Sequence, residues 1–330
     1  MDEIMSNNEK RFFRWFSLLL GMVLIVVLAL NLSFTKTPVP DGKNHSEKFQ
    51  RDYSIYSLEM PDSLYFAGER VPVDHFDVRE DLDRELLVNT YWQSHTILLI
   101  KRANRYLPRI DSILRANGVP EDFKYIPLIE SELTNAVSPA GAVGLWQFLR
   151  GTGRDYGLEI TQQVDERYHV EKATEAACRF FKESYRKFGS WTLAAASFNY
   201  GRSALNRQLE RQEAESYYNL ILNQETARYI YRILAMKLIL EDPEQYGFNI
   251  RAQDLYYPIP VRRVEVDTTV ENFAQFARDH SINYKYLKIL NPWLREAYLK
   301  NPQGKSYQIK IPRGGERNYR SILQANIDSL

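Results

Sequence analysis

The segment Phe123–Phe148 restricts the fold of this chain more than any other. It begins with an apolar run and places the carboxylate of Glu130 directly after it. A carboxyl group on an apolar surface favours its neutral form, because burial penalises the charge, and it can then donate a proton near neutral pH. Small residues follow, which let backbone approach a ligand closely, and the segment ends in Leu-Trp-Gln-Phe. The pattern is compatible with a carbohydrate cleft around Glu130, but from these residues alone an ordinary helix followed by a turn is favoured.

Composition excludes several classes of function. The chain has 330 residues and a formal net charge of +1, so no global positive field points to nucleic acid. Its single cysteine, Cys178, excludes an internal disulfide, and none of its five histidines has the spacing of a zinc site. We therefore predict no metal, no other cofactor and no nucleic-acid partner.

An apolar run near the N-terminus is long enough to cross a membrane. Residues 15–34 carry no charge, and at about 1.5 Å per helical residue they would cover the ~30 Å core of a bilayer. Lys10, Arg11 and Arg14 precede the run, which predicts a cytoplasmic tail over residues 1–14. The run predicts a single-pass signal anchor in the inner (cytoplasmic) membrane, with the later residues in the periplasm.

A cleaved signal peptide is the alternative interpretation of this run. Its apolar region would normally be shorter, and an Ala-x-Ala cleavage site is absent, so the uncleaved anchor is favoured. No cysteine lies just after the run, which excludes a lipid-modified N-terminal cysteine.

Helical periodicity dominates the centre of the chain. Residues 35–77 are interpreted as a polar linker and an irregular arm that packs on the next domain, because prolines and glycines interrupt short apolar pieces. Over residues 78–248, apolar side chains recur every three or four positions, which predicts an almost entirely α-helical domain. The expected helices are a region from Val78 to Gly118, a helix from about Glu121 that carries Glu130, and helices over 173–188, 191–198 and 224–240.

The composition changes again in residues 249–330. Arg263–Asp267 and Tyr307–Ile311 alternate as strands, while residues 270–280 and 284–290 read as helices. This order predicts a small β-α-α-β module followed by a tail. The predicted fold class is thus mainly α, with a helical domain and a small C-terminal module.

Four segments of the helical domain follow one another in a specific order. They are Glu130-Ser131, Ser138–Phe148, Ser197–Gly201 and Glu225–Tyr229, and Val164–Arg167 adds a fifth. Together they resemble the D-type membrane-bound lytic murein transglycosylases over residues 121 to about 246, which implies a goose-type lysozyme-like catalytic domain. Two positions depart from that family: Phe198 stands where tyrosine is usual, and His169 lies near a position often held by aspartate.

Residues 261–313 resemble a LysM module. The resemblance rests on Val264–Asp267, the helix end at Asn291-Pro292, and the closing strand Tyr307–Pro312. It implies binding to glycans that contain N-acetylglucosamine, so that peptidoglycan glycan strands would be the partner of both parts of the chain.

The residues offer one well-placed carboxylate. Most glycosidases use two, one as acid and one as base or nucleophile. Glu132 is the obvious second candidate, but residues two apart on a helix point in widely different directions, so it should lie outside the cleft. A single carboxylate suffices if the substrate supplies the nucleophile.

The family resemblance implies such a reaction. Glu130 would protonate the glycosidic oxygen between N-acetylmuramic acid and N-acetylglucosamine. It would then take the proton of the muramoyl C6 hydroxyl, which closes a 1,6-anhydro ring without water. The resemblance assigns Tyr229 to orienting that carboxyl. It implies sugar contacts from Ser131, Ser138, Gln147 and Asn199, and a cleft lined by Trp146 and Tyr200.

Two other functions remain as alternatives. A hydrolytic lysozyme-type muramidase would activate water with another acid, such as Asp155 or Asp165. A non-catalytic peptidoglycan-binding scaffold would retain the fold without the reaction, but the intact Glu130 argues against it. The pattern does not distinguish exo from endo cleavage and implies no oligomeric state.

Overall fold

The computed structural model describes residues 15, 21–22, 55–313 and 317–327. The tail over 1–14 and nearly all of the predicted anchor over 15–34 lie outside the described residues, as does most of the linker. Three residues of the predicted anchor are described, Trp15, Gly21 and Met22, and all three are helical and exposed. Within the described ranges, no helix is both long and apolar enough to cross a bilayer. Residues 58–330 form one compact unit.

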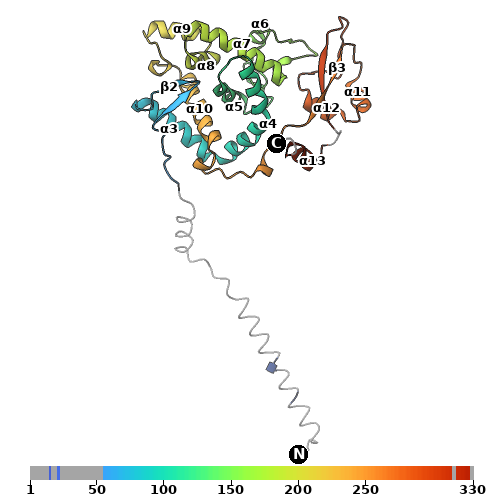
Figure 1. Ribbon diagram of the computed structural model, residues 1–330, viewed down its shortest axis with the longest axis horizontal. Coiled ribbons are helices and arrows are strands. Elements are labelled where there is room, and N and C mark those ends of the chain that lie inside the picture. The colour runs from blue at the N-terminus through green and yellow to red at the C-terminus, as the bar shows by residue number, and fades with distance from the viewer. Residues whose placement is uncertain (1–14, 16–20, 23–54, 314–316, 328–330) are drawn as a thin grey trace, which may run out of the picture. The chain divides into compact units, whose positions relative to one another are not determined.

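A mainly α-helical domain precedes a small mixed module. Its helices are α3 (Phe76–Tyr91), α4 (Gln93–Ala116), α5 (Ile126–Ser131), α6 (Arg150–Asp155), α7 (Val170–Phe188), α8 (Trp191–Tyr200), α9 (Arg202–Arg211) and α10 (Gln224–Glu241). The short helix α5 is central, with the longer helices around it (Figure 1). Helix α3 packs against α10, and α7 packs against both α4 and α8.

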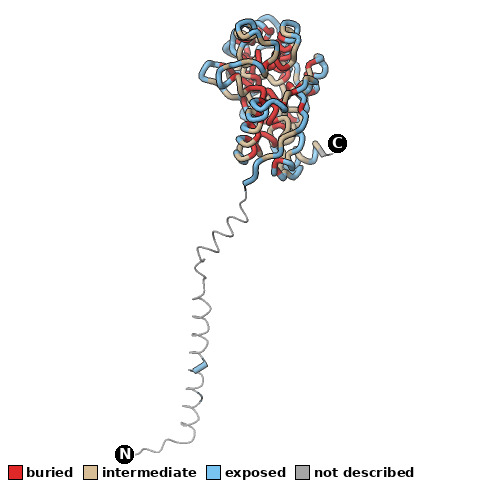
Figure 2. Tube along the Cα trace, turned by 90° about the vertical axis from the view of Figure 1, so that its left-hand side faces the viewer, coloured by how far each residue is buried: buried red, intermediate tan, exposed pale blue. Residues whose placement is uncertain are grey.

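Helix α7 illustrates why these segments form helices. Small and aromatic side chains at three- and four-residue spacing make one buried face, which includes Ala173, Ala177 and Phe181. Gly189 ends the helix with a left-handed φ of 67°, which a residue without a Cβ adopts readily. Burial of a Phe side chain such as that of Phe181 contributes about 1.5–3 kcal/mol. Figure 2 shows such buried positions running through the interior of the folded unit.

The helical region expected from Val78 to Gly118 is broken at Trp92. This residue separates α3 from α4, with φ −91° and ψ 59°. The side chain of Asn89 donates to the carbonyl of Glu85, and the hydroxyl of Thr96 donates to the carbonyl of Asn89. Side chains that bond to backbone offer it an alternative to the helix, and here they stabilise the break.

The sequence suggested an irregular arm before α3, but part of this arm has regular structure. It contains an antiparallel hairpin of β1 (Leu64–Phe66) and β2 (Glu69–Val71), which turns at Ala67 and Gly68. Leu64, Phe66 and Val71 are buried in the same core as the helices, so the expected packing on the next domain is confirmed. Helix α9 was not expected from the sequence.

The C-terminal module has the predicted order β-α-α-β. Its elements are β3 (Val261–Val266), α11 (Phe273–Asp279), α12 (Tyr284–Leu290), β4 (Tyr307–Pro312) and the additional helix α13 (Tyr319–Ile327). Strands β3 and β4 pair antiparallel, with Val261 opposite Pro312 and Val266 opposite Tyr307. The core of the module also includes Val143, Val164 and Tyr168 of the helical domain.

Candidate active site

Glu130 lies near the end of α5, beside a tight turn. Ile126 and Leu128 are buried in the core, and Pro127 occupies the first turn, where a missing N–H costs least. Glu132 then takes the left-handed conformation, with φ 54°, and the chain leaves the helix. The Glu130 side chain is therefore presented at a surface pocket on an otherwise buried helix.

Glu132 points to a different environment. Its carboxylate is half-exposed and lies 3.7 Å from His95 Nδ1 and 3.5 Å from Arg102 Nη1. Glu132 nevertheless lines the α3 pocket together with Glu130, so the expectation that it lies outside the cleft is wrong. The expectation assumed regular helical spacing, but a left-handed turn follows α5 at Glu132.

Tyr229 is the direct partner of Glu130. It lies on α10, is almost fully buried, and donates its hydroxyl hydrogen to Glu130 Oε1 at 2.6 Å. The structure thus brings together two predicted residues that are 99 positions apart in the chain.

The environment of Glu130 favours a protonated carboxyl. Burial raises the pKa of Glu130 from its ordinary value of 4.5 to about 7. The hydrogen bond from Tyr229 and the positive charge of Arg232 lower the pKa and offset part of this effect, while the charge of Glu225 raises it slightly. A carboxyl with this pKa can both donate and accept a proton near pH 7.

Two pockets meet at Glu130. The first, the α3 pocket, has a volume of about 690 Å³ and lies between α3, α4 and α10. The second, the loop pocket, has a volume of about 710 Å³ and lies between α8, α10 and the segment Ser138–Phe148, here called the groove loop. Ile129, Glu130, Glu225 and Arg232 line both pockets. Together the two pockets form a groove with Glu130 at its centre.

The groove loop places Ser138 and Gln147 in the wall of the loop pocket. The hydroxyl of Ser138 accepts from the backbone N–H of Ala142 at 3.0 Å, so it also caps a turn. The amide of Gln147 donates to the carbonyls of Ala136 and Gly144, at 3.1 and 2.8 Å. Both predicted residues thus face the pocket and hold the shape of the loop.

Gly144 lets the groove loop approach a neighbouring segment closely. A Cβ on this glycine would lie 2.0 Å from the carbonyl oxygen of Arg167, and its φ of 79° is left-handed. No other residue fits without a shift of backbone, which explains a glycine at this position.

Asn199 connects α8 to the start of α10 within the loop pocket. Its amide nitrogen donates to Glu225 Oε1 at 3.1 Å, and its amide oxygen accepts from the hydroxyl of Thr226 at 2.8 Å. The side chain therefore orients Glu225 and is itself held by Thr226. Tyr200, the next residue, lines the same pocket, as the sequence predicted.

Trp146 and Ser131 are both buried, but only Ser131 lines the groove. Trp146 is fully buried and donates its indole N–H to Thr174 at 2.9 Å, so the expectation that it lines the cleft is wrong. Ser131 lines the α3 pocket, and its buried hydroxyl lies 2.8 Å from the carbonyl of Leu145 and ties α5 to the groove loop. In both cases the polar group of the side chain forms a hydrogen bond within the fold.

Phe198 stands where tyrosine is usual in the family that the sequence resembles. Its ring packs edge-on against Trp146, Phe148 and Phe180 in an aromatic cluster. Phe198 is partly buried and lines the loop pocket, so it supplies an apolar surface to that pocket.

Sequence reasoning missed Arg232 and gave Glu225 no role in the site. Arg232 lines both pockets and acts electrostatically on Glu130. Spacing could have found it, because it lies three residues after Tyr229 and thus on the same face of α10. The groove also contains Trp92, which is 57% exposed and stacks on His95 with ring centroids 4.1 Å apart.

The two aspartates considered as rival acids lie elsewhere. Asp165 is buried and pairs with Arg167 through two hydrogen bonds, of 2.9 and 2.7 Å. Asp155 lines a different cavity, beside Tyr156 and Arg202. Three further carboxylates line the groove: Glu225 lines both pockets, and Glu85 and Glu132 line the α3 pocket. Among the described residues, no cluster of three or more His, Cys, Asp or Glu could hold a metal ion.

A further cavity of about 840 Å³ lies away from the groove, between α4 and the end of α10. None of the predicted site residues lines it.

Comparison with known proteins identifies two domain families in the chain. Residues 110–221 match the family described as Transglycosylase SLT domain. Residues 262–315 match the Soluble lytic transglycosylase C-terminal LysM-like domain. The first match contains Glu130 and the groove loop, and the second contains the β-α-α-β module.

Curated relatives share the larger part of this chain. The Membrane-bound lytic murein transglycosylase D of Escherichia coli (strain K12) is 28% identical over 242 residues, which is 72% of this chain and 52% of that protein. The protein of the same name from E. coli O6:H1 gives the same values. A protein of Alteromonas sp. (strain M-1) named for tributyltin chloride resistance is 31% identical over 110 residues, 33% of this chain and 53% of its own length. The chain spans about half the length of these relatives.

Proposed function

We propose that this chain, which carries a transglycosylase SLT domain followed by a LysM-like domain, is a peptidoglycan lytic transglycosylase. It would cleave the β-1,4 bond between N-acetylmuramic acid and N-acetylglucosamine and leave a 1,6-anhydromuramoyl end. The observation that carries the proposal is the carboxyl of Glu130, which lines both pockets of the groove, accepts a hydrogen bond from Tyr229 and has a pKa that burial raises to about 7.

In the first step, protonated Glu130 gives its proton to the glycosidic oxygen as the bond from that oxygen to the muramoyl C1 breaks. The N-acetylglucosamine part leaves with a free hydroxyl. In the second step the muramoyl C6 oxygen bonds to C1, and its proton passes to the Glu130 carboxylate. The acid is thereby regenerated and no water is consumed.

Tyr229 and Arg232 support both halves of this cycle. Each stabilises the charged form of Glu130, which exists between the two steps. Burial stabilises the neutral form, which exists before and after them. The opposing effects leave the pKa of Glu130 near the working pH, as a group that alternates between acid and base requires.

The groove suits a polymer better than a small ligand. Its two pockets have Glu130 between them, so a glycan strand that crosses it would have sugars on both sides of the bond being cut. Gln147 and Tyr200 would contact the strand in the loop pocket, and Trp92 in the α3 pocket. The aromatic faces suit sugar rings, which carry both hydroxyl groups and apolar C–H surfaces.

A hydrolytic muramidase is the second candidate, and one observation favours it. Glu225 lines both pockets with Glu130 and accepts from Asn199, so a carboxylate is present in the groove that could activate water. Two features favour the ring-closing reaction: Glu225 is exposed, and Asn199 already engages its carboxylate.

We place the enzyme at the outer face of the inner membrane. The apolar run over residues 15–34 and the basic residues before it support a single-pass anchor. The E. coli relatives are named as membrane-bound proteins. Peptidoglycan lies on the same side of that membrane as the catalytic region of such a protein.

Digestion of isolated sacculi tests the proposed reaction. The chain from residue 55 onward should release fragments with 1,6-anhydro ends by mass spectrometry, and Glu130→Gln should lower the rate at least about 100-fold. The matched control is Glu121→Gln, which changes an exposed glutamate on the segment before α5. Reducing ends in place of anhydro ends would establish hydrolysis, and an active Glu130→Gln variant would reject the site.

A further inference from the structure

The C-terminal module is attached to the helical domain by backbone as well as side chains. Val164 forms an isolated antiparallel bridge with Leu294. The N–H of Asp165 donates to the carbonyl of Trp293 at 2.8 Å, and the N–H of Arg295 donates to the carbonyl of Gln163 at 2.7 Å. The module thus extends residues 163–165 of the helical domain as a short sheet-like ladder.

Apolar packing and ion pairs strengthen this attachment. Val164, Tyr168 and Trp293 are buried in one shared core, and the guanidinium of Arg295 lies 4.2 Å from the centre of the Tyr168 ring. Lys310 of β4 pairs with Glu171 at 2.8 Å. Lys305 pairs with Glu159.

An interface with a buried apolar core holds two domains in a fixed position, whereas small polar interfaces allow movement. The aromatic residues Trp293 and Tyr307 are themselves buried, with Tyr307 bonded to Glu159 at 3.0 Å. These side chains are therefore committed to the interface.

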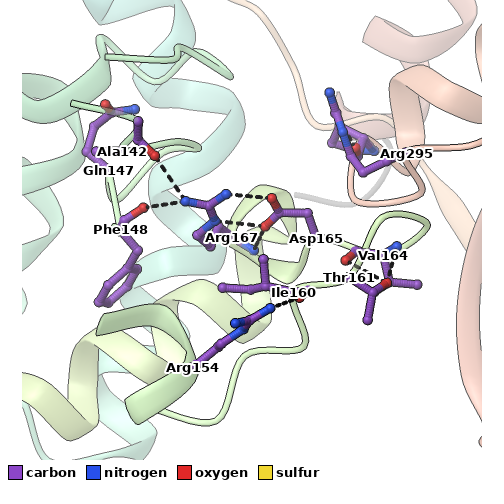
Figure 3. Close-up of polar contacts among 12 residues, drawn as sticks. Ala142, Gln147, Phe148, Arg154, Ile160, Thr161, Val164, Asp165, Arg167 and Arg295 are labelled. Atoms are coloured by element: carbon purple, nitrogen blue, oxygen red, sulfur yellow. Dashed lines mark hydrogen bonds and ion pairs between the residues drawn. The ribbon is translucent and has the colours of Figure 1, made fainter. Parts of the chain in front are cut away.

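The segment that the module holds is connected directly to the groove loop. Asp165 binds the guanidinium of Arg167 through two hydrogen bonds. Arg167 Nη1 in turn donates to the carbonyls of Gly141 and Phe148, both at 3.1 Å, and Figure 3 shows the bonds of Arg167 to Asp165 and Phe148. Gly144 touches the carbonyl of Arg167 between these two points.

We propose that the LysM-like module acts as a brace for the active site, and that Arg167 is the positioning residue through which it acts. The module fixes residues 163–165, Asp165 fixes Arg167, and Arg167 holds the groove loop at Gly141 and at Phe148. Ser138 and Gln147, on that loop, form one wall of the groove. This inference rests on the proposed function only for its effect on catalysis.

The proposal predicts a specific kinetic signature. Glu130 and Tyr229 lie on α5 and α10, whereas the braced wall is the groove loop. Loosening the wall should therefore weaken substrate binding while leaving the acid in place. We expect KM to rise by between about 10-fold and about 100-fold, with a smaller change in kcat and an unchanged pH profile.

Two variants test the connection from opposite ends. Arg167→Lys keeps the charge but loses the planar fork that reaches Asp165 and the loop together. Lys305→Met with Lys310→Met removes two ion pairs from the module side and leaves Arg167 intact. The matched control is Arg278→Met with Lys285→Met, which removes the same charge from exposed residues of α11 and α12.

Amide hydrogen exchange supplies a readout that is independent of catalysis. Both test variants should speed exchange at residues 141–148, and Arg167→Lys should do so more strongly. The melting temperature of the helical domain should stay unchanged in both. The control variant should not change the exchange rate of these residues. If exchange at 141–148 and KM stay at wild-type values in folded variants, the brace is rejected. If Arg167→Lys does not fold, the double lysine variant decides alone. A wild-type chain without activity on sacculi would reject the proposed function, while the exchange result would still judge the brace.

Discussion

At the scale of single residues, the site depends on opposing effects on one carboxyl. Burial raises the pKa of Glu130, while Tyr229 and Arg232 lower it, and the balance lies at about 7. Neither burial alone nor pairing alone would give a group that is present in both protonation states at neutral pH. The chemistry is therefore sensitive to each contact separately.

Replacement of Tyr229 by Phe should shift the pH dependence of cleavage upward. The hydroxyl of Tyr229 donates to Glu130 and favours the charged form, so its removal raises the pKa of that carboxyl further. Since the acid form of Glu130 would start the proposed reaction, kcat/KM should fall at alkaline pH, and the midpoint of that fall should rise by about one pH unit. Rates measured between pH 5 and pH 9 check this.

Tyr125→Phe is the matched control for this experiment. Tyr125 also bonds to a glutamate, Glu241, at 3.2 Å, but outside the groove. Its removal should leave the midpoint in place. A midpoint that moves to lower pH in Tyr229→Phe would contradict the assigned role of the hydroxyl.

Glu130 should also reduce the stability of the folded protein as pH rises. In the unfolded chain its carboxyl ionises near 4.5, but in the folded protein only near 7. Between these values the folded state binds more protons than the unfolded state, so the free energy of unfolding falls with increasing pH. Glu130→Gln removes this dependence and should stabilise the protein at pH 8, by up to about 3 kcal/mol, but little at pH 4.

Chemical denaturation at pH 4 and pH 8 measures this difference, with Glu121→Gln as the surface control. An equal effect of Glu130→Gln on the free energy of unfolding at both pH values would show that folding does not raise the pKa of Glu130.

At the scale of elements, the groove is made where helices end rather than where they are regular. Glu130 precedes the left-handed turn after α5, Asn199 lies at the end of α8, and Trp92 separates α3 from α4. Helix ends leave backbone groups and side chains free to face a ligand, while the buried helix centres hold them in position.

Trp92 is the exposed aromatic residue of the α3 pocket, so its loss should weaken binding of the glycan strand. One face of its ring stacks on His95, which leaves the other for a sugar. In a Glu130→Gln background, Trp92→Ala should raise the dissociation constant for soluble glycan fragments by between about twofold and about tenfold, and Trp92→Phe by less. Tryptophan fluorescence or calorimetry measures the affinity.

Phe76→Ala is the control, because Phe76 is an exposed aromatic residue at the start of α3 and lines neither pocket. Unchanged affinity in Trp92→Ala would mean that the strand does not enter the α3 pocket.

Local pattern predicted much of this arrangement, and contacts between distant segments account for the rest. Spacing and turn residues predicted the helices around the site and the β-α-α-β order of the module. The break at Trp92 depends on how Thr96 and Asn89 meet, and the burial of Trp146 depends on Thr174 and an aromatic cluster. Such contacts have no signature in local sequence, so the sequence predicted that Trp146 would line the cleft.

At the scale of the whole molecule, catalytic domain and module form one unit between residues 58 and 330. The sequence resemblance implied that the module binds glycans, but it did not address contacts between the module and the helical domain. Val143, Val164 and Tyr168 of the helical domain share a hydrophobic core with the module, which brings the two parts into direct contact. The contacts between two domains depend on side chains from both domains. The sequence motif of either domain alone does not predict them.

The position of this unit in the cell should depend on residues 15–34. If the run is an uncleaved anchor, the full chain should remain in the membrane fraction after alkaline extraction, with the mass of the complete sequence. Val26→Arg with Ala29→Arg should release it, because each charge near the centre of a spanning helix costs about 2.5–3.5 kcal/mol. Thr37→Arg with Gly42→Arg adds the same charge to the polar linker, where it meets water, and should leave the chain in the membrane. A soluble product whose mass lacks the N-terminal residues would instead identify the run as a cleaved signal peptide, and the enzyme would then reach peptidoglycan by diffusion rather than from a fixed point on the membrane.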